Sequence, residues 1–197
     1  MSTQRVRLSR PRAGGVGVGI RNGRRVSKRR PAESLGVGRK TTKYVGYYSG
    51  SGGESPVSVA NDVIFDQTEA EYDAASNVIF ITSRQRFHDA TGNGPLNGPE
   101  GEQPKSRDSY VATWFDGSGR QIATGNYGTN DNAGPPERPN SPPESTDDVL
   151  VSRVRYNERG EAFETVDPTG VVNRTESNAE GQPVTMLQNY VPCCGEE

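Results

Sequence analysis

Short turns with an Asp or Asn three residues before a Gly recur along this chain, each within β-rich sequence. The four clearest begin at Asp116, Asn157, Asp167 and Asn178 and end at Gly119, Gly160, Gly170 and Gly181. The last three begin 10 and then 11 residues apart, which is the length of one strand plus one turn. This spacing predicts consecutive β-hairpins, and it constrains the fold more than any other feature of the sequence.

The turn pattern has a physical basis. Asp or Asn at the first position of a type I turn accepts hydrogen bonds from the backbone ahead of it, and Gly at the fourth position supplies a positive φ. Two further pairs, Asp89–Gly92 and Asp131–Gly134, bring the total to six. From 23 Asp plus Asn and 24 Gly, chance would give about 3 such pairs. The regular spacing and the flanking sequence therefore carry the prediction, rather than the count.

The segments between the turns are typical of strands. They are runs of five to eight residues rich in Val, Ile, Tyr, Phe and Thr, bounded by Gly, Asn and Asp. The run 149–156 alternates in its second half, which predicts Val151, Val154 and Tyr156 at inward positions. No segment combines an apolar stripe with helix caps. The sequence predicts an all-β fold of antiparallel hairpins.

Two of the turns resemble the YD repeat of the Rhs (rearrangement hot spot) family. Phe115-Asp116-x-x-Gly119-Arg120 and Tyr156-Asn157-x-x-Gly160-Glu161, the latter followed by Asp167-Pro-Thr-Gly170, follow the family pattern Tyr-Asp-x-x-Gly-Arg and then Asp-x-x-Gly. Tyr72-Asp73 looks like another copy, with Ser76-Asn77 in place of Gly-Arg. The resemblance covers roughly 57–192 and is strongest at 110–128 and 149–191. Ser177-Asn178 departs from Tyr-Asp, so the last copy is degenerate.

The resemblance implies an open, twisted antiparallel sheet, part of a β-ribbon shell. It also implies a cell-surface or secreted protein of the polymorphic-toxin type, with carbohydrate or cell-surface binding in some members. We interpret the chain as a short member or fragment without the core-associated and C-terminal effector regions. The predicted structural residues are the turn positions Asp73, Asp116, Gly119, Asn157, Gly160, Asp167, Gly170, Asn178 and Gly181, and the repeat aromatics Tyr72, Phe115 and Tyr156.

The composition predicts a thin core. Leu, Ile, Val and Phe together make 34 of 197 residues, about 17%, and chains below roughly 20% struggle to bury a core. Repeat units bury their faces only against neighbours, and a short array leaves open sheet edges that invite pairing with another chain. We therefore expect other YD-repeat segments, or self-association through sheet edges, as partners.

The charge is divided along the chain. Residues 1–45 hold 13 basic residues and one acidic residue, a net charge of +12, and the remainder has a net charge of −14. This Gly/Arg-rich arm has no periodicity, and the sequence predicts that it is disordered. It could be an inert tail or a mispredicted start, it could fold back on the acidic body, or it could bind nucleic acid or an anionic surface. The predicted anion-binding residues are Arg21, Arg24, Arg25, Lys28, Arg29 and Arg30.

Two Pro/Gly-rich loops, 93–107 and 129–148, interrupt the repeats. Their composition favours extended, solvated chain, either functional or inserted at a hairpin tip. A short tail, 193–197, begins with Cys193-Cys194, a vicinal pair that can bridge itself only with strain. An intermolecular bridge, a metal-binding tail and no role at all remain open for this pair.

The sequence shows no constellation for catalysis, and we expect neither an enzyme nor a cofactor. The single histidine, His88, precedes a turn, and neighbouring Asp89 points to the opposite face of a strand. A solvent-facing strand histidine is the expected outcome. One His and two Cys cannot assemble a usual tetrahedral zinc site. The Gly14–Gly19 run fits neither the dinucleotide nor the P-loop spacing.

Three function classes compete. The first is a non-catalytic scaffold or binding module, in which exposed aromatic side chains could stack on sugar rings, although we expect sheet-core packing for each of the candidates. The second is nucleic-acid binding through the arm, and the third is an enzyme. The aromatic candidates for sugar stacking are Trp114, Tyr127 and Tyr190.

No run is apolar enough for a signal peptide or a membrane span.

Overall fold

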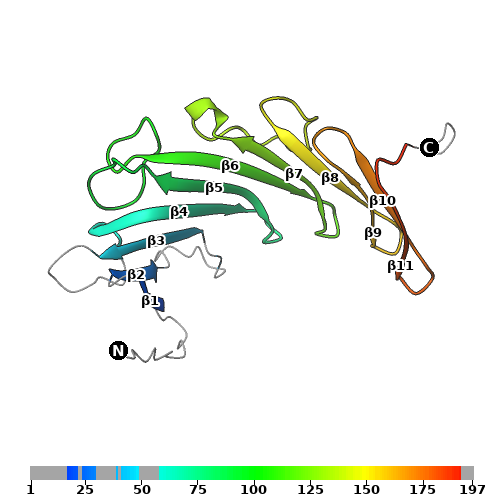
Figure 1. Cartoon of the computed structure of the whole chain (residues 1–197), viewed down its shortest axis with the longest axis horizontal. Coiled ribbons are helices and arrows are strands. Elements are labelled where there is room, and N and C mark those ends of the chain that lie inside the picture. Colours follow the sequence, from blue (N-terminus) through cyan, green and yellow to red (C-terminus); the bar gives the residue numbers. More distant parts are fainter. Residues whose placement is uncertain (1–16, 22–23, 30–38, 40, 49–57, 192–197) are drawn as a thin grey trace, which may run out of the picture. The chain divides into compact units, whose positions relative to one another are not determined.

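The computed structural model describes residues 17–21, 24–29, 39, 41–48 and 58–191. The described chain is all-β, as the sequence predicts, and its only helical element is the 3₁₀ turn η1, Asn130–Asn132. Hydrogen-bonded neighbours follow chain order from β1 to β11, and the pairs β1–β2, β2–β3 and the consecutive pairs from β6 to β11 are antiparallel (Figure 1). The strands are β1 Gly17–Arg21, β2 Arg24–Arg29, β3 Thr42–Tyr48, β4 Asp62–Tyr72, β5 Val78–Arg86, β6 Ser106–Phe115, β7 Gln121–Gly128, β8 Leu150–Tyr156, β9 Ala162–Val166, β10 Val172–Ser177 and β11 Pro183–Leu187.

The chain divides into two compact units. The first contains residues 1–68 and 84–106, and the second contains residues 69–83 and 107–197. The strands β4, β5 and β6 pass from one unit to the other, whereas β7 to β11 belong wholly to the second.

Part of the basic N-terminal arm forms the strands β1 and β2. β1 and β2 pair with register Arg21↔Arg24, and Ser27 to Arg29 of β2 pair with β3. The prediction of a disordered arm concerns residues that lie largely outside those the structure describes. The sequence holds a signal for this pair, because Asn22-Gly23 separates the two runs and Asn-Gly is typical of two-residue hairpin turns.

The first unit buries part of the loop 93–107. Leu96 is 3% exposed, Ile64 and Gln67 of β4 are also buried, and the Leu96 N–H donates to Gln67 Oε1 at 2.7 Å. The Gly94 N–H donates to the carbonyl of Asp62 at 2.8 Å. The prediction of a solvated loop is wrong here, because the loop backbone finds its hydrogen bonds on β4 and needs no water at these positions.

The second unit has a small aromatic and aliphatic core. β6 alternates buried and half-buried positions along most of its length, as a strand with one covered face does. The ring of Phe80 on β5 stacks on that of Tyr110 at 6.2 Å between centroids. A Cβ at Gly125 would lie 3.1 Å from the indole of Trp114, so this glycine leaves room for the ring. The core residues are Phe80, Tyr110, Ala112, Trp114, Ala123, Val149 and Val151.

The loop 129–148 joins the paired strands β7 and β8, and although none of its residues is buried, it bonds to the sheet beside this core. The indole Nε1 of Trp114 donates to the carbonyl of Pro139 at 2.9 Å. The Arg138 guanidinium lies 5.0 Å from the centre of the indole ring and donates to the carbonyl of Thr113 at 2.9 Å. Arg153 donates to the carbonyl of Pro143 at 2.8 Å. The prolines therefore present fixed carbonyl acceptors to the sheet.

Two of the three inward positions predicted on β8 need correction. Val151 is 2% exposed in the core, whereas Val154 and Tyr156 are half-buried. Successive side chains alternate between the faces of a strand, so Val151 lies on one face and Val154 with Tyr156 on the other. The apolar residues of 149–156 therefore lie on both faces of β8 and not on a single inward face.

Candidate functional site

Four hairpin tips of the second unit share one hydrogen-bond pattern. In the tip that begins at Asn157, the side-chain Oδ1 accepts from the N–H groups of Arg159 and Glu161 at 3.0 and 2.9 Å. The backbone adds Gly160 N–H to Asn157 O and Asn157 N–H to Glu161 O, both at 2.9 Å. The tips that begin at Asp116, Asp167 and Asn178 repeat all four bonds at 2.8 to 3.0 Å.

The fourth position of each tip has the predicted positive φ. The glycines Gly119, Gly160, Gly170 and Gly181 have φ between 76° and 87°. Asp73 begins a related tip, in which Ser76 takes the glycine position with φ 73° and the Asn77 N–H donates to Asp73 Oδ1 at 2.8 Å. The predicted turn residues are therefore placed as expected. Asp131–Gly134 differs, because Asp131 itself has φ 48° and lies within η1.

The first and fifth side chains of a tip are chemically complementary. Where the first is a carboxylate, the fifth donates: Arg120 Nε lies 2.7 Å from Asp116 Oδ2, and Asn77 Nδ2 lies 2.9 Å from Asp73 Oδ2. Where the first is an amide, the fifth accepts: Asn157 Nδ2 donates to Glu161 Oε2 at 2.7 Å. Asn178 and Gln182 repeat this arrangement at 3.2 Å. This pairing is readable from the sequence, because both side chains belong to the same five-residue segment.

The tips that lie at the same end of the strands also contact one another. These are the tips between β4 and β5, β6 and β7, β8 and β9, and β10 and β11 (Figure 1). A Cβ added to Gly119 would lie 4.0 Å from Asn77 Oδ1; one at Gly160 would lie 3.3 Å from Arg120 Nη1; and one at Gly181 would lie 2.7 Å from Glu161 Oε1. The fifth side chain of each tip therefore packs against the glycine of the next. We call this series the tip row.

Arg159 strengthens the last step of the tip row. Its guanidinium donates to the carbonyls of Ala179 and Asn178, each at 3.1 Å, and lies 2.8 Å from Glu161 Oε2. By contrast, the tip that begins at Asp167 lies at the opposite ends of the strands, and a Cβ at Gly170 would meet nothing within 4 Å. That tip has Thr169 instead, whose hydroxyl donates to Asp167 Oδ1 at 2.7 Å.

The tip hydrogen bonds lower the pKa values of two of the tip carboxylates, Asp116 and Asp167. The backbone N–H of Arg120, helped by the Arg120 guanidinium and the Ser118 N–H, holds the pKa of Asp116 below its ordinary value of 3.8. The Thr169 hydroxyl, followed by the Val171 N–H, does the same to the pKa of Asp167. Both groups are therefore ionised acceptors at neutral pH, and their role is to hold the turn.

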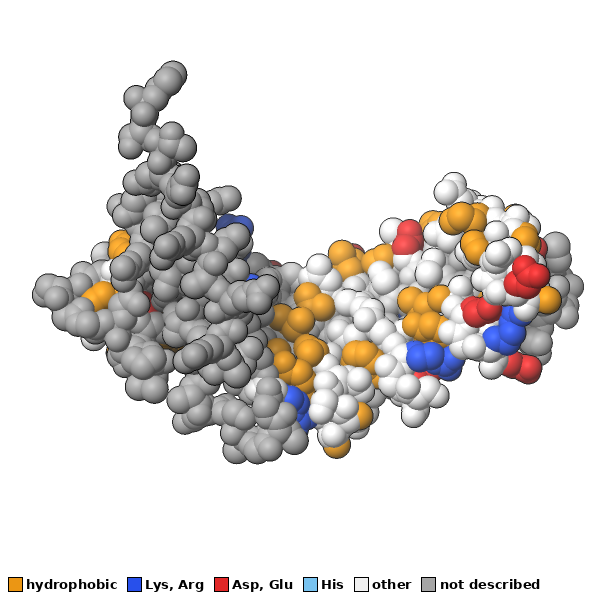
Figure 2. All heavy atoms as spheres, turned by 90° about the horizontal axis from the view of Figure 1, so that it is seen from below, with side chains coloured by type: hydrophobic (Ala, Val, Ile, Leu, Met, Phe, Trp, Pro, Cys, Tyr) orange, Lys and Arg blue, Asp and Glu red, His pale blue; other side chains and the backbone are white. Residues whose placement is uncertain are grey.

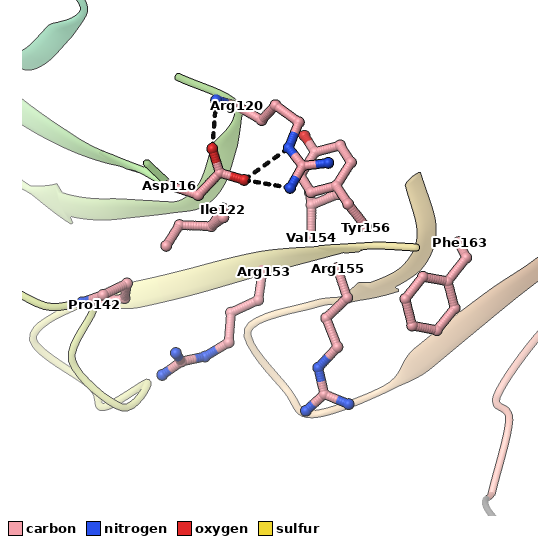
Figure 3. A pocket seen from close by; sticks show the side chains of 9 residues that line it. All are labelled: Asp116, Arg120, Ile122, Pro142, Arg153, Val154, Arg155, Tyr156 and Phe163. Atoms are coloured by element: carbon pink, nitrogen blue, oxygen red, sulfur yellow. Dashed lines mark hydrogen bonds and ion pairs between the residues drawn. The ribbon is translucent and has the colours of Figure 1, made fainter. Parts of the chain in front are cut away.

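A shallow hollow of about 490 Å³ lies where β7 and β8 separate. The ladder between these strands ends at Ala123↔Arg153. Beyond that point the Tyr156 hydroxyl bridges the strands by donating to the carbonyl of Gln121 at 2.8 Å. Figure 3 shows Asp116, Arg120 and Tyr156 on one side of β8, with Arg153 and Arg155 pointing to the other. The lining residues are Asp116, Arg120, Ile122, Pro142, Arg153, Val154, Arg155, Tyr156 and Phe163.

The three arginines of this hollow are neutralised by carboxylates. Arg120 pairs with Asp116 at 2.7 Å, Arg153 with Glu144 at 2.9 Å and Arg155 with Glu164 at 2.9 Å. The Arg120 guanidinium also lies 4.6 Å from the ring centre of Tyr156, the repeat aromatic (Figure 3). The nine lining residues include no His, Ser or Cys, so they offer no nucleophile–base pair of the kind acyl transfer needs.

The aromatic side chains predicted as sugar platforms are largely covered. Trp114 is 2% exposed, so the sheet-core packing expected for it is confirmed. Tyr127 packs against the same core, and burial raises its pKa. Tyr190 is half-buried, with the Arg174 guanidinium 4.9 Å from its ring centre. The sequence did not reveal this, because the covering arginines are distant in the chain.

The other predicted site residues carry little further chemistry. The side chain of His88 is 97% exposed, with Nδ1 4.0 Å from Asp89 Oδ1, and lies in a turn after β5 rather than in a strand. Within the described ranges, no group of three or more His, Cys, Asp or Glu side chains could hold a metal. Arg30, Cys193 and Cys194 lie outside the described residues.

The face shown in Figure 2 has small groups of hydrophobic side chains separated by uncharged surface. Basic and acidic side chains occur together on it, toward the right of the view. The large hydrophobic side chains that are exposed in the described chain are Phe65, Leu150, Val184, Met186 and Val191.

No protein-family model matches the chain, and no curated protein matches it significantly. No helix among the described residues is long and apolar enough to cross a membrane. The class that the structure defines is an antiparallel β-repeat protein built from Asx-x-x-Gly hairpins.

Proposed function

We propose that this chain is a non-catalytic β-repeat scaffold that presents its sheet for binding, and that it is part of a cell-surface or secreted Rhs/YD-repeat protein. The tip row is the observation that supports the scaffold: the same turn recurs, and each copy packs on the next. In such arrays stability comes from the units and from the contacts between nearest neighbours. The proposal does not assign sugar stacking to Trp114 or Tyr190, because Arg138 and Arg174 cover their rings.

Limited proteolysis with far-ultraviolet circular dichroism on the full chain tests whether the repeats form a folded scaffold. We expect a β-type spectrum and a resistant fragment close to 57–192. Cleavage within the β6–β11 tips as fast as cleavage of the N-terminal arm would contradict the proposal.

Hydrogen exchange tests the coupling between tips. Replacing Asn157 with Ala removes the acceptor of two backbone N–H bonds. We expect faster exchange in that tip and in its two neighbours, which begin at Asp116 and Asn178, with little change at the tip of Asp73. Because nearest-neighbour coupling defines a repeat scaffold, an effect confined to residues 157–161 would contradict the proposal.

A second candidate function is binding of nucleic acid or another anionic surface through the arm. The observation in favour is that β1 and β2 place five basic residues on two adjacent paired strands. Counterion release predicts that affinity for a DNA duplex would fall steeply with salt. Fluorescence anisotropy of the full chain, compared with a variant carrying Gln at Arg21, Arg24 and Arg25, measures this. Equal binding by the two proteins would rule it out.

A further inference from the structure

The last strand of the second unit, β11, is an open edge. Among the described strands it pairs only with β10. Natural sheets usually protect such an edge with charged residues, Pro or a covering segment. β11 has only Pro183 at its start, and two of its hydrophobic side chains stand in solvent: Val184 is 64% exposed and Met186 is 76% exposed.

The tip row has a direction that ends beside this edge. The fifth side chain of each tip meets the glycine of the following tip: Asn77 meets Gly119, Arg120 meets Gly160, and Glu161 meets Gly181. Gln182 holds the same fifth position in the last tip, and it is exposed. The edge of β11 and the side chain of Gln182 therefore present the same two features that each earlier hairpin offers to the next.

We infer that the β11 edge receives a β-hairpin with an Asx-x-x-Gly tip. The first strand of that hairpin runs antiparallel to β11, and its glycine lies beside Gln182. Backbone hydrogen bonds along the edge supply affinity, as in other cases of strand addition, and side-chain fit supplies the choice of partner. Here that fit is apolar contact with Val184 and Met186 and the absence of a Cβ opposite Gln182. This inference rests on the proposed scaffold function.

The probe is a peptide with the sequence of residues 149–166, closed into a hairpin by a terminal disulfide and carrying a fluorescent label. This segment is β8, its tip and β9, the hairpin that follows another tip in the same way within the chain. Closure is needed because an isolated hairpin is marginally stable. Fluorescence anisotropy measures its binding to the full chain.

Three variants make the measurement specific. Lysine at both Val184 and Met186 should weaken binding by about tenfold or more, since charged residues block edge pairing. Leu150→Lys is the matched control: Leu150 is 51% exposed but lies on the interior strand β8, so binding should be unchanged. In the peptide, Gly160→Asn keeps a residue that tolerates positive φ and adds a side chain opposite Gln182, so binding should fall by a similar factor.

Equal binding by the lysine variant, or by the Gly160→Asn peptide, would overturn the inference. So would self-association of the chain through β11 with no response to the peptide. Hydrogen exchange on the same samples separates this failure from failure of the scaffold. Protected tips without peptide binding would overturn the β11 inference alone, whereas freely exchanging tips would overturn the scaffold and this surface together.

Discussion

Within the second unit, the hairpin region of β6 to β8 and the region of β9 to β11 share the same tips but differ in what holds them. The first region buries Tyr110, Ala112 and Trp114 in one core, and the loop 129–148 contacts Trp114. In the second region, Glu164 is the only buried side chain among the described residues of β9, β10 and β11. The comparison shows that the repeated turn sets the topology, whereas a core forms only where a long loop covers one face.

The largest expected effect tests the covered region. Trp114→Ala removes the largest of the fully buried side chains and two contacts with the loop 129–148. We expect the free energy of unfolding to fall by about 3–5 kcal/mol, as for other buried aromatic truncations. Denaturant unfolding measures it, with Leu150→Ala as an exposed control expected to change by less than about 0.5 kcal/mol. Similar losses for the two variants would mean that the loop forms no effective cover.

A smaller effect separates the tip row from the isolated tip. Alanine at Gly170 must adopt a positive φ, which costs about 1–2 kcal/mol. Alanine at Gly160 meets the same cost and must also displace Arg120 Nη1, which would lie 3.3 Å from the new Cβ. Because a guanidinium can move, the extra loss should be only a few tenths of a kcal/mol. Equal destabilisation of the two variants would show that the contact between neighbouring tips contributes no stability.

The complementarity of the first and fifth side chains predicts rescue. Asn157→Asp keeps the Oδ1 acceptor but faces a carboxylate across a 2.7 Å contact with Glu161, so it should destabilise the fold by about 0.5–1 kcal/mol. Adding Glu161→Gln restores a donor opposite an acceptor, as in the Asp73–Asn77 pair.

A double-mutant cycle with the single Glu161→Gln variant measures this coupling. The single variant is the control for the lost pair between Glu161 and Arg159. Additive losses would show that the side-chain pairing at the tips contributes no stability.

The smallest effect is pH-dependent and distinguishes Asp tips from Asn tips. The pKa values of Asp116 and Asp167 are lowered on folding, so their stabilisation is complete above the ordinary value of 3.8 and is lost as pH falls through the lower folded value. Asn157 and Asn178 do not titrate. Asp167→Asn should therefore reduce the loss of stability in acid, measured by thermal unfolding below pH 3.8. A steeper loss in the variant would contradict this assignment.

The tips could be predicted from sequence because every hydrogen bond in them spans four residues or fewer. Asn157, Arg159 and Glu161 supply donors and acceptors within one short segment. Even the tip of Asp73 was visible, although Ser76 stands where glycine is usual. The pairing of first and fifth side chains was equally local and could have been found by comparing Arg120, Glu161 and Gln182.

The cover over Trp114 could not be predicted in the same way. Its partners Pro139 and Arg138 lie about 25 residues further along the chain, in a segment whose prolines favour solvated, extended chain. The same applies to Leu96 and Gln67, which are joined across a sequence separation of 29 residues. The composition of a loop does not show which distant strand its backbone groups will bond to, so these contacts could not be predicted from the sequence.

The tip row also has a consequence for how such a gene could change. Successive tips in contact begin at Asn157 and Asn178, with the isolated tip of Asp167 between them. Duplication or loss of a whole two-strand segment would again place the fifth side chain of one tip against the glycine of the next. Loss of a single strand would move every later tip to the opposite ends of the strands. In-frame recombination at this two-strand interval would therefore lengthen or shorten the molecule while keeping its joints intact.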